Sequence, residues 1–214
     1  MRFPILTAML VPIALLAGCA REELAGPDPA ETLGDASITA NGAGSAAGDD
    51  AEAIAAGEAA AAALTRELMG RVSGAIAQGG PAYAIEFCSE EALTVTSAVA
   101  EELGVRIKRT SSRVRNPQNA PDPDEREALA YFEGELEDGR PLPEHLIRQT
   151  DGETRYYRPI IVAELCTTCH GPRDALDPEV RNVLDMRYPE DQATGYAPGD
   201  FRGLIRVSLP ATDG

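Results

Sequence analysis

The chain has 214 residues, with 19 Lys and Arg against 35 Asp and Glu, and its formal net charge is −16. A surface this acidic repels phosphate backbones, so nucleic-acid binding through a basic groove is excluded. The length suits one domain with additional ends, and four cysteines are too few for a disulfide scaffold of this size.

The first 18 residues predict an export signal. Arg2 precedes an apolar run, residues 3–16, that is too short to span about 30 Å of hydrocarbon, and small residues follow it. Residues 16–19, Leu-Ala-Gly-Cys, resemble the bacterial lipobox, which implies cleavage before Cys19 and acylation of its sulfur. A plain signal peptide or an uncleaved anchor is the alternative. We therefore expect a lipid-anchored protein that faces the periplasm, and Ala20 favours the outer membrane.

Residues 19–50 predict a lipidated tether without fixed structure, because they contain almost no large apolar side chain. The folded domain is expected over residues 51–214. It starts with an Ala-rich helix at residues 50–78, which carries an apolar stripe. A pair of glycines ends this helix, and Pro81 starts a second helix that runs to about Leu103.

Strands and one further helix follow. Residues 105–110 alternate between apolar and polar side chains and predict a strand. Residues 153–162 predict another strand or a pair of strands, and residues 201–209 predict the last strand. A loop at residues 116–123 precedes a helix at residues 124–137. Helices first and strands later predict an α+β fold, with the N-terminal helices packed on a central antiparallel sheet.

The segment Cys166-Thr167-Thr168-Cys169-His170 is C-x-x-C-H, the signature of c-type haem attachment. Two thiols at this spacing reach the two vinyl groups on one edge of the porphyrin, and the histidine then points towards the iron. The alternatives are a thioredoxin-type pair, which needs a βαβ pattern that is missing here, and half of a zinc site, which needs further ligands. The motif predicts one covalently bound haem c, with His170 as an iron ligand.

The remaining cysteine, Cys88, falls on one helix face with two alanines, Ala84 and Ala92. Small residues beside a thiol would let a flat porphyrin lie against the helix while the sulfur reaches the iron. The alternative is a buried cysteine that packs as a small apolar residue. Four other residues are candidates for the sixth iron ligand: Met69, Lys108, His145 and Met186.

Three arginines, Arg109, Arg113 and Arg115, lie in one stretch of an otherwise acidic chain. A guanidinium matches the geometry of a carboxylate, so these side chains are candidates to pair with the haem propionates. The alternative is a solvated basic strand edge.

The chain resembles a family of PAS-like, c-type haem domains with Cys/His iron ligation, first seen in a cyanobacterial protein and found also as extracytoplasmic sensor regions. The resemblance covers roughly residues 80–209. It implies a PAS-like fold and Cys88 as the ligand opposite His170. The chain departs from the family at Asp124, where a tryptophan is frequent, which puts local packing in doubt. The matching positions are Ala84, Ile85, Cys88, 109–111, 114–121, Glu125, Leu129, Phe132, 157–160, 166–171, Tyr188, Pro189, Asp191, Ala193, Gly195, Tyr196, Gly199, Asp200, Arg202 and Gly203.

Two functions are compatible with this site. A thiolate ligand stabilises ferric iron and is lost readily on reduction, which favours a redox or diatomic-gas sensor whose output passes through a partner protein. A periplasmic electron-transfer cytochrome is the alternative, and its partner would be another redox protein. A haem enzyme needs an open distal position with an acid or base, and Cys88 closes that position, so we expect no enzymatic activity.

Overall fold

The computed structural model describes residues 43–150 and 152–210. Cys19, the export signal and most of the expected tether lie outside these residues. The described helices include none that is long and apolar enough to cross a membrane. The first helix, α1, runs over Ala43–Glu102, so it begins earlier than the predicted residue 50.

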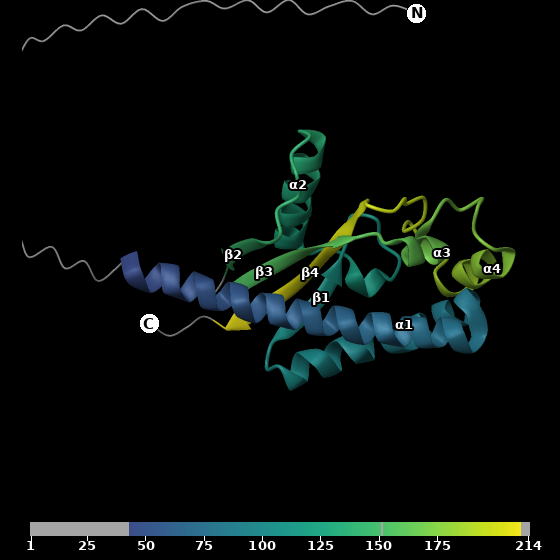
Figure 1. Ribbon diagram of the computed structural model, residues 1–214, viewed down its shortest axis with the longest axis horizontal. Coiled ribbons are helices and arrows are strands. Elements are labelled where there is room, and N and C mark those ends of the chain that lie inside the picture. The colour runs from purple at the N-terminus through teal and green to yellow at the C-terminus, as the bar shows by residue number, and fades with distance from the viewer. Residues whose placement is uncertain (1–42, 151, 211–214) are drawn as a thin grey trace, which may run out of the picture. The chain divides into compact units, whose positions relative to one another are not determined.

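α1 consists of two helical segments joined at Gly80, whose backbone is not helical (φ 80°, ψ 179°). The second segment starts with Pro81 and folds back beside the first, as Figure 1 shows. Proline suits this position because the first turn of a helix has no use for its missing amide hydrogen. The predicted pair of helices is therefore confirmed, including the place where they meet.

The sheet has four antiparallel strands in the order β1-β4-β3-β2. The strands are β1 (Arg106–Thr110), β2 (Leu146–Thr150), β3 (Glu153–Ile161) and β4 (Phe201–Pro210). Three of them were predicted, and the edge strand β2 was not. β3 and β4 form the centre, and their pairing shifts in register between Ile160 and Ile161.

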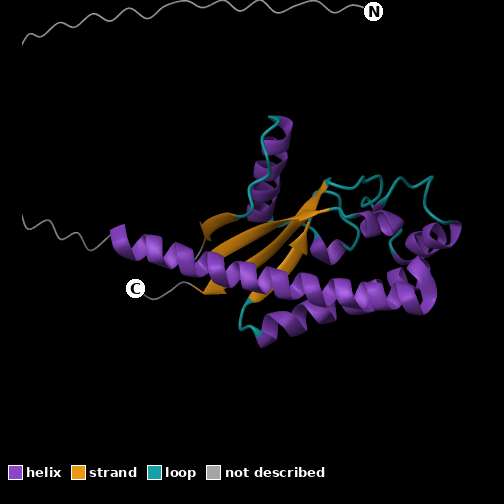
Figure 2. Ribbon diagram, viewed as in Figure 1, coloured by secondary structure: helices purple, strands orange, loops and turns teal. Residues whose placement is uncertain are grey.

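The two faces of the sheet carry different helices. On one face Tyr156 packs with Ala61 and Leu64 of α1. On the other, Tyr157 packs with Phe132 of α2 (Pro123–Glu137). Successive strand residues point to opposite faces, so these two neighbouring tyrosines belong to separate parts of the core. The predicted α+β fold with helices on an antiparallel sheet is confirmed (Figure 2).

A 3-10 turn (Pro117–Asn119) lies between β1 and α2. Beyond the end of β3 follow a second 3-10 turn (Glu164–Cys166), the short helix α3 (Thr167–His170) and α4 (Pro178–Arg187), and none of these three was predicted from the sequence. α4 packs its residues Val180 and Leu184 against Ile85 of the second α1 segment. These contacts hold the α3 region next to α1, close to the α1 turn (Figure 1).

Candidate functional site

A cavity of about 530 Å³ brings together the three described cysteines and one of the two histidines of the chain. Its walls come from α1, the ends of β1 and β3, and α3, which are far apart in the sequence (Figure 1). Cys88, Cys166, Cys169 and His170 all line it. Its volume lies within the roughly 300–1,000 Å³ of pockets that bind cofactors and other small molecules.

The two cysteines of the C-x-x-C-H motif lie on one tight helical turn. The hydroxyls of Thr167 and Thr168 donate to carbonyl oxygens three residues earlier, at 2.7 and 2.8 Å, which closes the turn. Residues three apart on a helix share one side, so Cys166 and Cys169 both face the cavity. The local hydrogen bonds thus present two thiols side by side.

His170 is held in one orientation. Its Nδ1 lies 2.7 Å from the carbonyl oxygen of Ala193. A carbonyl only accepts, so Nδ1 carries the proton and Nε2 keeps a free electron pair. Burial, together with the nearby guanidinium groups of Arg115 and Arg202, lowers the pKa of His170 to about 3. A neutral imidazole oriented by its other nitrogen is what a metal-ligating histidine requires.

Arg115 fastens this turn to the following loop. Its Nε donates to both carboxylate oxygens of Asp191 at 3.1 Å, and one terminal nitrogen donates to the carbonyls of Cys169 at 2.7 Å and Ala193 at 3.1 Å. The side chains of Arg115 and Asp191 are only 12% and 2% exposed. The same loop residue, Ala193, therefore positions both the histidine and the arginine.

Cys88 lies on the second segment of α1 and lines the same cavity as the C-x-x-C-H turn. Ala84 and Ala92 line the cavity with it, as the small-residue face predicted. Burial raises the pKa of the Cys88 thiol, and the guanidinium of Arg109 acts in the opposite direction. The Nε of Arg109 is itself buried and has no hydrogen-bond partner among the described residues. The cavity thus contains a thiol and, near it, a cation that forms no ion pair with the described residues.

The three predicted arginines separate in the structure. Arg109 and Arg115 line the cavity with the cysteines, whereas Arg113 does not. Its guanidinium lies 4.0 Å over the ring of Tyr196, and its Nε donates to the carbonyl of Gln192. The chain has left β1 by residue 111, so the strand alternation that directs Arg109 no longer directs Arg113.

Of the other candidate ligands, Met69 alone lines the cavity. His145 stacks on a tyrosine of β3, with ring centroids 5.5 Å apart. Met186 is 70% exposed on α4, and the Nζ of Lys108 lies 2.6 Å from a buried glutamate of α2. Cys88 and Met69 therefore remain as the candidates opposite His170.

Several cavity residues were not identified as site residues from the sequence. Two are cationic, Arg158 and Arg202, and Arg158 is held by an ion pair with Glu58 of α1 at 3.1 Å. Both arginines are among the positions that match the family, and this match was the one sequence feature that could have marked them as site residues. Others include a tyrosine and an apolar wall on the first α1 segment: Leu68, Val72, Ile76 and Tyr188.

These residues fit a flat, anionic, iron-containing cofactor better than a bare ion. The described residues contain no group of three His, Cys, Asp or Glu side chains close enough to hold a metal ion. The sulfur and nitrogen donors instead line one large cavity with an apolar wall. Arg109, whose buried Nε has no hydrogen-bond partner among the described residues, supplies a cation that a carboxylate of the cofactor can neutralise.

Comparison with known proteins agrees with this fold. Residues 40–210 match the model of a family described as Tll0287-like. No curated protein matches the chain. A solved structure, described as the crystal structure of the cyanobacterial heme-protein Tll0287, is similar with a TM-score of 0.54 and 24% sequence identity. The similarity covers 73% of this chain and 93% of that one.

Proposed function

The chain belongs to the Tll0287-like family, and from this membership and the cavity we propose that it is a haem protein with a redox-linked sensing function. The observation that carries the proposal is the single cavity shared by Cys88, Cys166, Cys169 and His170. The similar solved structure is described as a heme-protein, which supports haem as the cofactor. Bound haem supplies an iron that changes oxidation state, and the residues of this chain hold and tune it.

We assign the haem to the c type, with one group attached through Cys166 and Cys169. Two thiols on one side of a closed turn support this assignment, since both can reach one edge of a porphyrin. Cys166 and Cys169 would each hold the haem through a carbon–sulfur bond to one vinyl group, with the thiol hydrogen passing to the neighbouring vinyl carbon, so that the attachment would need no external oxidant.

The iron would be held by Nε2 of His170 and by the sulfur of Cys88. The hydrogen bond from Nδ1 to Ala193 supports the first. The family resemblance and the place of Cys88 in the cavity wall support the second. Arg109 and Arg115, with the additional cations Arg158 and Arg202, form the cationic part of the wall that would face the propionates.

We base the sensing function on how little the protein stabilises a negative charge on the Cys88 sulfur. No described residue donates a hydrogen bond to it, in contrast to Cys166, whose sulfur accepts from the amide of Ala163 at 3.4 Å. An anionic sulfur in a buried cavity is costly unless a metal neutralises it. Ferrous iron would offset this negative charge less than ferric iron, so we expect Cys88 to dissociate on reduction and leave a position for a diatomic gas.

Electron transfer is the second candidate, and one contact favours it. The ring of Tyr196 lies edge-on to His170, with centroids 6.3 Å apart. Tyr196 is itself buried, but it also lines a second cavity that is bordered by the exposed side chain of Leu136. An electron carrier needs such a short connection between its cofactor and its surface. In both functions we propose a protein without enzymatic activity of its own.

The location we propose is the cell envelope, with acylated Cys19 in a membrane and the domain in the periplasm. The lipobox-like residues 16–19 and the short apolar run before them support this proposal. The outer membrane is favoured by Ala20.

Acid–acetone extraction of protein matured with the haem-attachment machinery tests the cofactor assignment. We expect haem to stay with the protein, and to be lost when Cys166→Ser and Cys169→Ser are combined. Met186→Leu is the matched control, because Met186 lies outside the cavity. Haem that leaves the unmodified protein with the solvent contradicts c-type attachment.

A further inference from the structure

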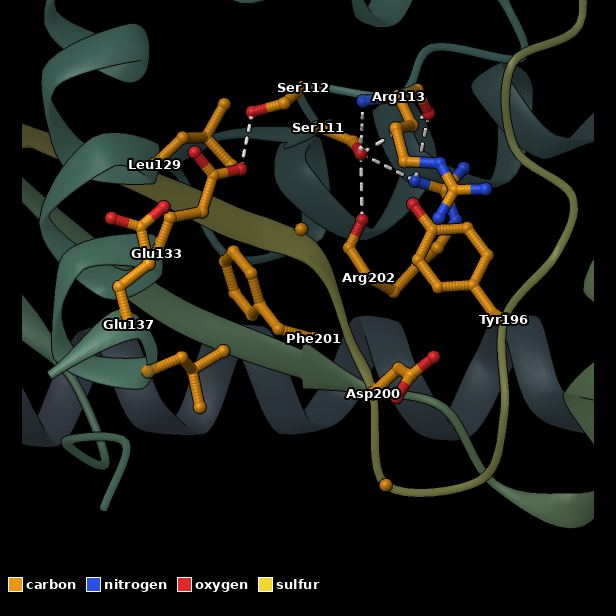
Figure 3. Close-up of a pocket in the computed structure, with 13 residues that line it drawn as sticks. Ser111, Ser112, Arg113, Leu129, Glu133, Glu137, Tyr196, Asp200, Phe201 and Arg202 are labelled. Carbon is orange, nitrogen blue, oxygen red and sulfur yellow. Dashed lines mark hydrogen bonds between the residues drawn. The ribbon is translucent and has the colours of Figure 1, made fainter. Parts of the chain in front are cut away.

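A second cavity, of about 410 Å³, lies on the other side of the sheet end, between α2 and the start of β4 (Figure 3). Its floor is apolar and comes from Leu129, Leu136 and Phe201. Leu136 is 45% exposed, although it is a large apolar side chain. The cavity is therefore open to solvent and offers an apolar surface that the described fold does not cover.

Three carboxylates surround this floor: Glu133 and Glu137 on α2, and Asp200 before β4. Glu133 accepts a hydrogen bond from Ser112 at 2.7 Å, and Asp200 accepts one from the amide of Ala197 at 2.7 Å. Yet none of the three forms an ion pair with any described residue, although two arginines, Arg113 and Arg202, line the same cavity. Their charge is therefore not neutralised within this part of the chain.

The two cations in the lining are directed elsewhere. Arg202 donates to the hydroxyl of Ser111 at 2.6 Å and to the carbonyl of Arg113 at 3.1 Å. Both guanidinium groups lie over the ring of Tyr196, at 4.0 Å for Arg113 and 5.3 Å for Arg202. Figure 3 shows these groups gathered at one end of the cavity, with Glu133 and Glu137 at the other. The acidic end remains available to a cation from outside.

We infer that this cavity is the docking site for a basic protein partner, which places a lysine or arginine side chain over the apolar floor and its charge among Glu133, Glu137 and Asp200. Such side chains pack their aliphatic stems on apolar surface while the charged end seeks a counter-charge. The net charge of −16 attracts a basic protein from a distance, and the unpaired carboxylates define where it binds.

The site is connected to the proposed haem through one residue. Tyr196 lines the second cavity, contacts His170 edge-on, and donates its amide to the carbonyl of His170 at 2.9 Å. A partner docked there lies next to the ring that contacts the proposed iron ligand. The inference thus rests on the proposed function and adds the place where a partner exchanges electrons or receives a signal.

Stopped-flow kinetics with a basic probe protein tests this inference. The reduced holoprotein is mixed with ferric mitochondrial cytochrome c, and one electron passes from one haem iron to the other. We expect the second-order rate to fall with ionic strength, and to fall at least about fivefold at low salt when Glu133→Gln and Glu137→Gln are combined. The matched control combines Glu101→Gln and Glu102→Gln at the exposed end of α1, which changes the net charge equally and should alter the rate less than about twofold.

Carbodiimide cross-linking gives an independent result, because it joins carboxylates to lysines that touch them. We expect links from cytochrome c lysines to Glu133, Glu137 or Asp200. Equal effects of the two variant pairs, or links confined to other acids, overturn the inference. Failure of the proposed function would be detected separately. If the chain is not a c-type haem protein, acid–acetone extraction would find no covalent haem before any partner is added.

Discussion

At the scale of single residues, the two proposed iron ligands are held very differently. His170 is fixed through Ala193, which in turn is bound by Arg115. Cys88 is positioned by its helix alone, with no hydrogen bond to its sulfur from the described residues and with Arg109 as the nearby cation. A fixed histidine keeps the iron in place, and a sulfur without support can leave it. If both residues hold the iron as proposed, this difference favours His170 as the permanent ligand and Cys88 as the exchangeable one.

Cys88→Ala therefore should convert low-spin ferric haem into a high-spin form while the covalent attachment is retained. The midpoint potential should rise, because an anionic donor that favours ferric iron has been removed. Absorption spectra of the ferric protein and a redox titration measure both effects. Reduced Cys88→Ala should bind CO at least as readily as the reduced unmodified protein.

Met69→Leu is the control for this prediction, since Met69 lines the same cavity from the other α1 segment. We expect its ferric spectrum and potential to match those of the unmodified protein. If Met69→Leu changes them and Cys88→Ala does not, the second ligand is Met69 and the electron-carrier function gains support.

Asp191→Asn tests the loop that orients His170. It leaves Arg115 buried with a weaker partner, and breaking a buried ion pair costs about 3 kcal/mol of unfolding free energy. Denaturant unfolding of the holoprotein measures this loss. Asp185→Asn, which breaks the exposed pair between Arg173 and Asp185, should cost less than about 1 kcal/mol. Equal losses in the two variants would show that the Arg115 contacts add little to the fold.

At the scale of elements, the break in α1 determines where Cys88 lies. The first segment supplies the apolar wall, and the turn at Gly80 brings the second segment back with its thiol facing that wall. Gly80 has φ 80° and ψ 179°, a combination that residues with a Cβ adopt only at a cost. The angle between the segments thus depends on one glycine.

Gly80→Ala should lower the unfolding free energy by about 1–3 kcal/mol, since the space around Gly80 is open and the cost is one of backbone conformation. Thermal unfolding followed by circular dichroism measures it. Gly74→Ala is the control in the same element: it lies in a regular, exposed part of the helix and should stabilise the protein by about 0.5–1 kcal/mol. A neutral Gly80→Ala would mean that the turn relaxes into another conformation.

The elements that the sequence predicted are those with strong local signals. The α1 segments have an apolar stripe and a Gly-Gly-Pro boundary, and α2 has Asp122 and Glu125 in a capping box. β2 was missed because it is a short edge strand whose side chains are half exposed, so its alternation is weak. α4 was missed because it is only ten residues long and its apolar side chains are few.

At the scale of the whole molecule, the cavity depends on contacts between distant segments, and these limited the prediction of the site. The C-x-x-C-H spacing is local, so its thiols and His170 were identified directly. Arg158 and Arg202 were not, because their roles depend on which ends of β3 and β4 meet α1. Arg113 was grouped with Arg109 by sequence proximity, although the chain turns away after Thr110.

The membrane anchor is also a property of the whole molecule, and it rests on residues outside the described ones. Each buried acyl CH₂ contributes about 0.8 kcal/mol, so several acyl chains on Cys19 would hold even a strongly acidic domain at a membrane. Cys19→Ser should therefore release the protein into the soluble periplasmic fraction with its haem still attached. Fractionation with haem staining measures both. Ala20→Asp is the control, because it keeps the acylated cysteine and should stay in the membrane fraction, moving from the outer to the inner membrane. If Cys19→Ser remains in the membrane fraction, the anchor is the uncleaved apolar segment and not a lipid.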